Sequence, residues 1–232
     1  MSSSGIQRVE AVFEVLVAGF AGWLITILAV SLTGLQGSGL LSRPVYMAAV
    51  LIVEATITLF LIRFLEGSQD PLNSGVFGFI HWSPAGMLQG AAAVPVLFLV
   101  VVSSGWMFEL TFPQYVTEGN PLLEMIKTPL DLAAFLIAGI YAGGIKEEVQ
   151  RAFILMRFEK HLGGISIGLI LWSLVFGLGH FEQGWSSAFS AGVLGLLFGG
   201  IFLWKRNLFT AIWVHAVYDV TVLLIYWNYF RN

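Results

Sequence analysis

Seven apolar runs, each long enough to cross a membrane as a helix, follow one another along this chain. A transmembrane helix needs about 20 mostly apolar residues, and only helices and closed barrels satisfy all backbone polar groups in lipid. Charged residues make up only 11% of the chain, whereas soluble domains have about 25%. The sequence therefore predicts an all-α fold, a polytopic transmembrane helix bundle of about seven spans. The expected spans are residues 12–32, 45–65, 87–107, 130–156, 165–181, 185–204 and 208–229.

The distribution of basic residues predicts an orientation for this bundle. An odd number of spans puts the two ends of the chain on opposite sides of the membrane. Six lysines and arginines would then lie on the side of the N-terminus and three on the other side. Because basic residues favour the cytoplasmic side, we expect an integral, multi-pass membrane protein with a cytoplasmic N-terminus. No long repeat and no second domain is evident, so residues 1–232 are expected to form a single membrane domain.

Two absences from the sequence exclude several classes of function. The chain contains no cysteine, which excludes disulfides, a thiol nucleophile and a cysteine-ligated metal. It also contains no basic run of the kind that binds nucleic acid, so no nucleic-acid partner is expected. The expected partner is the lipid bilayer itself.

The most unusual stretch is Gly143–Phe153, where four charged residues fall within six positions of an apolar segment. One charge at the centre of a membrane helix costs about 2.5 kcal/mol or more, so these groups must pair or face water. Glu147 and Glu148 lie four and three residues before Arg151, on the same side of a helix. One arginine could therefore hold both carboxylates ionised. Alone, this stretch is equally consistent with a structural ion pair.

Two further stretches carry ionisable residues inside expected spans. The fifth span contains His180 near its end, and the seventh contains His215 and Asp219, which are four apart and share a helix face. Helices this apolar bury such groups only by directing them at each other or at water. The three stretches together therefore predict a convergent site with acid, base and hydrogen-bond donor groups.

The residue types in this site favour hydrolysis by activated water. A carboxylate with a histidine can act as a general base, and a second histidine with a polar partner can stabilise an oxyanion. The same groups could instead hold a divalent metal such as zinc, which would activate the water. In that case the ligands would be Glu147, His180, His215 and Asp219, a nitrogen and oxygen set compatible with zinc.

At this point the sequence resembles a known family. The stretches Glu147-Glu148…Arg151, Phe176-x-x-x-His180 and His215-x-x-x-Asp219 look like the three motifs of the CPBP intramembrane proteases. That family includes the type II CAAX prenyl endopeptidases and bacteriocin-processing or immunity proteins. The resemblance covers a protease-like core at residues 130–222, and the earlier residues are similar only in being membrane helices.

The resemblance implies a glutamate-dependent endopeptidase that uses no cofactor. Glu147 would activate water with help from His180, Glu148 and Arg151 would support and orient it, and His215 with residue 219 would stabilise the oxyanion. The chain departs from the family's pattern in two ways. Only two residues separate the glutamate pair from Arg151, where the family usually has three, and position 219 holds Asp where the family often has Asn. An ionised Asp219 cannot donate to an oxyanion, so it must be protonated, orient His215 or bind a metal.

Three functions compete on these observations. The first is an intramembrane endopeptidase that cleaves a membrane-embedded or lipid-modified, CAAX-like peptide, so that the expected substrate is a membrane or prenylated peptide. The second is a non-catalytic member of the same fold that binds a partner or confers immunity, which the two departures favour. The third is an ion-coupled transporter, since proton relays also use Glu and His in membrane helices. No inverted repeat supports a transporter, and we expect the endopeptidase.

Overall fold

The computed structural model describes residues 3–34, 39, 43–67, 75–116 and 119–230, and all regular structure in these residues is helical. Within these described residues, six helical stretches are long and apolar enough to cross a membrane: residues 5–31, 44–65, 84–111, 129–161, 185–205 and 208–229. The apolar helix over residues 165–179 is shorter. The prediction of an all-α, multi-pass membrane bundle is confirmed.

The described helices follow the expected spans closely from the second span onward. They are α1 (Ser3–Leu16), η1 (Val17–Ala21), α2 (Gly22–Ser31), α4 (Pro44–Leu65), η2 (Gly75–Phe79), α5 (Pro84–Thr111), η3 (Pro113–Tyr115), α6 (Pro121–Glu124), α7 (Pro129–Ala138), η4 (Gly139–Glu147), α8 (Glu148–His161), α9 (Ile165–Gly179), η5 (Phe181–Gln183), α10 (Trp185–Lys205) and α11 (Leu208–Tyr229). Here η1 and η4 are π-helices, while η2, η3 and η5 are 3₁₀-helices.

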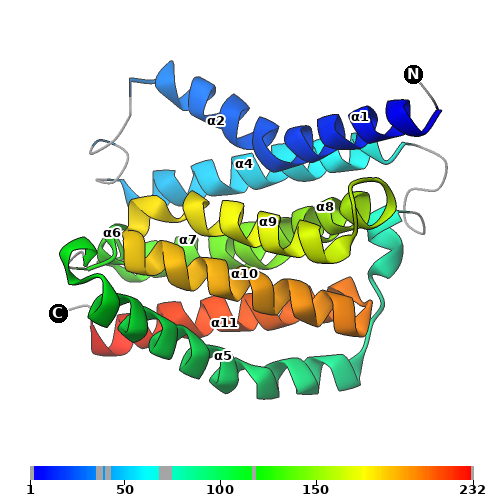
Figure 1. Ribbon diagram of the computed structural model, residues 1–232. Helices are drawn as coiled ribbons and strands as arrows, with labels where there is room; N and C mark the ends of the chain where they lie inside the picture. The colour runs from blue at the N-terminus through cyan, green and yellow to red at the C-terminus, as the bar shows by residue number, and fades with distance from the viewer. Residues whose placement is uncertain (1–2, 35–38, 40–42, 68–74, 117–118, 231–232) are drawn as a thin grey trace.

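The helices cross the bundle in alternating directions, and α9 is one of the crossings (Figure 1). Its 15 residues correspond to about 22 Å of helix, less than the ~30 Å of a hydrocarbon core. It nevertheless runs between its neighbours α8 and α10 from one end of the bundle to the other (Figure 1). With α9 included, the described residues make seven crossings, so α1 begins and α11 ends at opposite ends of the bundle.

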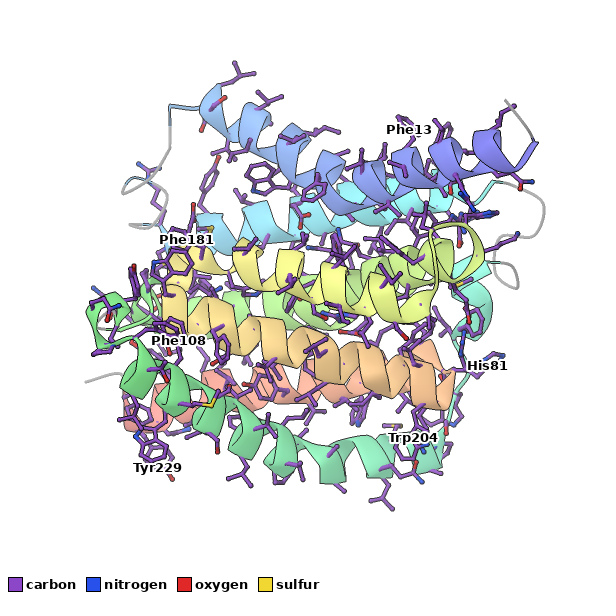
Figure 2. The ribbon with its side chains drawn as sticks, in the orientation of Figure 1. Phe13, His81, Phe108, Phe181, Trp204 and Tyr229 are labelled. Carbon is purple, nitrogen blue, oxygen red and sulfur yellow. The ribbon has the colours of Figure 1, made fainter. Side chains whose placement is uncertain are left out.

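Aromatic side chains gather at both ends of the bundle. Figure 2 shows His81 and Trp204 at one end and Phe108, Phe181 and Tyr229 at the other. Trp204 and Tyr229 are among the most exposed large side chains in the described residues. Such rings are enriched at the level of the lipid headgroups. Their two groups therefore mark the two interfaces of the membrane, with the helices running between them.

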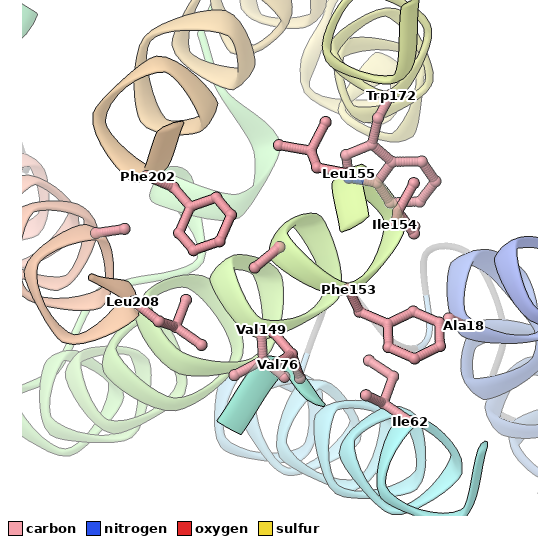
Figure 3. Close-up of a cluster of buried hydrophobic side chains, with 12 residues drawn as sticks. Ala18, Ile62, Val76, Val149, Phe153, Ile154, Leu155, Trp172, Phe202 and Leu208 are labelled. Atoms are coloured by element: carbon pink, nitrogen blue, oxygen red, sulfur yellow. The ribbon is translucent and has the colours of Figure 1, made fainter. Parts of the chain in front are cut away.

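The main hydrophobic core surrounds α8, the helix that follows the charged stretch. Phe153, Ile154 and Leu155 of α8 are fully buried. Their side chains point outward in different directions, toward residues of the helices around them (Figure 3). The cluster includes Ala18 of η1, Ile62 of α4, Trp172 of α9, Phe202 of α10 and Leu208 of α11. The charged stretch is thus continuous with the most enclosed helix of the bundle.

Candidate functional site

The charged stretch lies where a π-helix passes into an α-helix. The preceding helix, α7, begins with a capping box. The Thr128 hydroxyl accepts a hydrogen bond from the Asp131 amide, and the Asp131 carboxylate accepts one from the Thr128 amide. After α7, the backbone continues through η4 and becomes α-helical at Glu148. The π-helix ends at Glu147, the first residue of the motif. Segments of π-helix are rare and occur frequently at functional sites.

Two glycines of η4 allow α11 to approach closely. A Cβ atom at Gly144 would lie 2.8 Å from the Ala216 Cβ and 3.2 Å from the Ala216 Cα. A Cβ atom at Gly143 would lie 2.2 Å from the Asp219 Oδ2. Small residues permit this kind of close backbone packing in membranes. The third motif, on α11, therefore lies directly against the first.

The most deeply buried part of the site is a chain of three side chains. Arg151 donates from Nη1 to Glu148 Oε1, and the same oxygen lies 2.7 Å from His215 Nδ1. Arg151 and Glu148 are each 1% exposed, and His215 is 5% exposed. In the described residues no ion pair joins Arg151 to Glu147, so the arginine does not bridge the two carboxylates. The Glu148 carboxylate connects α8 to α11 and fixes one side of the imidazole ring.

Aromatic rings enclose these three side chains. The His215 ring stacks on Phe198 of α10, with ring centroids 4.1 Å apart and planes inclined by 19°. The Arg151 guanidinium lies over Phe176 of α9, 4.7 Å from its ring centroid, and 5.7 Å from that of Phe198. These contacts hold the cation and the imidazole in fixed planes and shield them from water, which strengthens their electrostatic interactions with Glu148.

The other nitrogen of His215 faces two less buried carboxylates. Its Nε2 lies 3.8 Å from Glu147 Oε2 and 3.6 Å from Asp219 Oδ2. The Glu147 and Asp219 side chains are 18% and 25% exposed, against 0% for Glu148. Both distances exceed those of direct hydrogen bonds. The site therefore has a sealed side at Nδ1 and an accessible side at Nε2.

The His180 side chain contacts Phe176 of α9 and not the Glu148–Arg151–His215 group. It follows the last residue of α9, and its Nδ1 lies 2.8 Å from the Phe176 carbonyl oxygen, with which it can share a hydrogen bond. Its ring also contacts the Phe176 ring, which in turn lies against Arg151. In the described residues no hydrogen bond or ion pair joins His180 to Glu147. Its expected role as a helper of Glu147 stays a prediction.

Two polar residues beside the motif have partners that the sequence did not indicate. Lys146 Nζ lies 3.0 Å from Glu54 Oε2 on α4, and the Thr58 hydroxyl donates to the other oxygen of Glu54 at 3.0 Å. The buried Gln150 side chain donates to the Ala18 carbonyl oxygen at 2.7 Å. A lone acid in the second span and a lysine beside Glu147 were visible signals, but only the packing of the helices pairs them.

An apolar groove borders the site along η4 and α11. It encloses about 340 Å³, and its lining includes Ala216, which packs on Gly144 and directly follows His215. The groove is lined by Ile140, Ile145, Phe209, Ile212, Trp213, Ala216, Val217, Val220 and Thr221. Across the described part of the chain, no group of three or more His, Asp or Glu side chains is placed to hold a metal ion. The four-ligand zinc set also stays a prediction.

Comparison with known proteins gives a family model that matches this part of the chain. Residues 128–221 match the family model described as type II CAAX prenyl endopeptidase, Rce1-like. The match contains all six candidate residues and leaves out Glu54. Neither the curated proteins nor the solved structures yielded a match. The resemblance expected from the three motifs is confirmed, because residues 128–221 match the Rce1-like type II CAAX prenyl endopeptidases, in agreement with the CPBP family of intramembrane proteases.

Proposed function

We propose that this protein is an intramembrane endopeptidase that hydrolyses a membrane-embedded or lipid-modified peptide with a glutamate-activated water. The observation that carries the proposal is the arrangement around His215, which has a buried Glu148–Arg151 pair at Nδ1 and the accessible Glu147 and Asp219 at Nε2. The match to a protease family over the same residues supports it.

In the proposed reaction, Glu147 is the general base. It takes a proton from water, and the water oxygen attacks the scissile carbonyl carbon while the carbonyl oxygen becomes an oxyanion. Glu147 then returns the proton to the leaving nitrogen as the carbon–nitrogen bond breaks. A positioned carboxylate that moves a proton in this way contributes about 10²–10⁴-fold to the rate. Glu147 Oε2 lies 3.8 Å from His215 Nε2. A water and a carbonyl group bound beside Glu147 would therefore also lie close to His215.

We assign oxyanion stabilisation to His215 and Asp219. With Nδ1 held by Glu148, the Nε2 of His215 is the nitrogen that faces the reacting side, and a protonated Nε2 can donate to an oxyanion. Asp219 contributes either as a protonated donor or by orienting the imidazole. Glu148 and Arg151 hold the ring in place, and no cofactor takes part. His180 completes the proposed set as the helper of Glu147.

The surroundings of the site support a membrane-bound substrate. The groove beside Gly144 and Ala216 is lined almost entirely by apolar side chains and runs along helices that face lipid. An apolar peptide segment or an acyl or prenyl chain could lie there with its peptide bond near Glu147. The proposed orientation places the N-terminal end of α1 on the cytoplasmic side of the membrane. Trp204 marks the interface at the same end of the bundle.

Turnover of defined peptides tests this function. The purified protein is reconstituted into vesicles and offered a panel of prenylated, acylated and unmodified membrane peptides, with products identified by mass spectrometry. We expect cleavage of at least one lipid-modified or membrane-embedded peptide. Glu10→Gln, which changes an exposed acid of α1, should cleave at the wild-type rate. Tight binding of a peptide without cleavage would instead indicate a non-catalytic member of the fold.

A further inference from the structure

Lys146 forms an ion pair that the proposed reaction does not use. Its side chain is 11% exposed and that of Glu54 is 14% exposed, with 3.0 Å between Nζ and Oε2. Glu54 lies halfway along the 22-residue helix α4, and Lys146 lies within the span 129–161. Charges at such positions are rare in membrane helices and mark functional sites.

The pair connects the end of the π-helix to a helix outside the family match. Lys146 is the residue directly before Glu147, yet the two side chains have partners on different helices. Lys146 contacts α4, whereas Glu147 faces His215 on α11. A second contact between the same two elements joins Tyr141 of η4 and Thr56 of α4, whose hydroxyls lie 3.3 Å apart. The π-helix is thus held between α4 and α11.

A residue within the motif, Gln150, is anchored to the same part of the bundle. Gln150 donates to the Ala18 carbonyl in η1, the other π-helix of the structure's described residues. In a π-helix the hydrogen bonds run over five residues instead of four, so the transition out of it leaves carbonyl groups available to side chains. The N-terminal third of the bundle therefore contacts the chain directly before the motif, at Lys146, and within it, at Gln150.

We propose that Glu54 and Lys146 are a positioning pair that keeps η4 in its π conformation and so directs Glu147 toward His215. The effect on turnover rests on the proposed function. A π-helix is less regular than an α-helix and persists where its surroundings stabilise it. If η4 relaxed to an α-helix, each residue would turn further about the axis, and Glu147 would rotate away from the Nε2 side of His215. A displacement of about 1 Å at a reacting group can lower the rate roughly 10²-fold.

Variants of the pair test this role in the full-length protein. Lys146→Met and Glu54→Gln should each lower kcat about 10- to 100-fold, with KM unchanged because substrate contacts remain. The exchanged variant Glu54→Lys/Lys146→Glu should recover most of the lost kcat. Glu14→Gln is the matched control. It breaks an ion pair of similar burial between α1 and Arg157 of α8, ten residues beyond Glu147, and should leave kcat unchanged.

Hydrogen–deuterium exchange tests the same role without turnover. In lipid nanodiscs, Lys146→Met should accelerate exchange in peptides from residues 139–148 more than in peptides from α10, and Glu14→Gln should not. Unchanged or uniformly faster exchange would overturn the proposal, as would an exchanged variant no better than the single ones. If the wild type cleaves no peptide, the proposed function fails, while the exchange pattern still decides whether the pair holds η4.

Discussion

At the scale of single residues, the site is organised by the two nitrogens of His215. Glu148 and Arg151 occupy the buried side, and Glu147 and Asp219 occupy the accessible side. Three carboxylates thus surround one imidazole, with a single guanidinium among them. Each buried charge depends on its neighbours, so a change at the sealed side and a change at the accessible side should have different consequences.

On the sealed side, Arg151→Ala should reduce stability more than it alters chemistry. The change leaves the fully buried Glu148 carboxylate without its cation, and breaking a buried ion pair in this way costs roughly 3–5 kcal/mol. Thermal unfolding in detergent measures the loss. Arg206→Ala breaks an exposed pair with Glu159 and should cost only about 0–1 kcal/mol. Equal melting temperatures for Arg151→Ala and wild type would refute the structural role.

On the accessible side, Asp219→Asn distinguishes the metal-free mechanism from a metal-dependent one. Asn has nearly the shape of Asp and carries an NH₂ donor, so a metal-free site should keep or gain turnover, and strong chelators should have no effect. A zinc site would lose a ligand and turn over slowly. We expect full activity of Asp219→Asn with and without chelator. A dead variant together with a chelator-silenced, metal-rescued wild type would show the opposite mechanism.

At the scale of elements, the π-helix η4 is the feature that could not be predicted from the sequence. The lengths of the apolar runs located the spans well, and the last one, 208–229, coincides with α11. They could not reveal η4, because a π-helix has no residue pattern of its own. The first helix begins nine residues before the expected span, because residues 3–11 are helical although five of them carry polar side chains. The pairing of Arg151 with Glu148 followed from the three-residue spacing, whereas Lys146 and Glu54 required the packing of two helices.

Gly144→Ala tests the close contact between η4 and α11. The new methyl group would meet the Ala216 backbone at 3.2 Å, so the helices must separate and move His215 away from Glu147 and Glu148. We expect a lower melting temperature and at least a tenfold loss of turnover, since a shift of about 1 Å is costly.

Gly200→Ala is the control, because nothing lies within 4 Å of its added Cβ. It should be neutral or stabilise by about 0.5–1 kcal/mol. Equal behaviour of the two variants would argue against a close contact.

At the scale of the whole molecule, the two aromatic ends of the bundle define its position in the membrane. The basic residues predict that the end bearing Trp204 is cytoplasmic. The six candidate residues lie in three polar stretches of otherwise apolar sequence, in the fourth, fifth and seventh expected spans, which is why the motifs could be found. The distances between these residues depend on how the helices pack, which apolar runs and motif spacing do not specify.

Single cysteines can establish the orientation, because the chain has none of its own. Lys160→Cys places an exposed thiol at the end of α8, and Gln114→Cys places one in η3 at the opposite end of the bundle. In intact cells, a membrane-impermeant maleimide should label Gln114→Cys, while Lys160→Cys should react only after the membrane is opened. The reverse pattern would place the N-terminus outside.

The role of Glu147 as the general base is tested most directly by the turnover of Glu147→Gln in the vesicle assay. Gln keeps the size of the side chain and cannot accept the proton of water, so a general base at this position predicts a loss of about 10²–10⁴-fold. The melting temperature should stay close to that of wild type, because the Glu148–Arg151–His215 chain is untouched. Near-normal cleavage by Glu147→Gln would contradict the assignment and move the base to another residue.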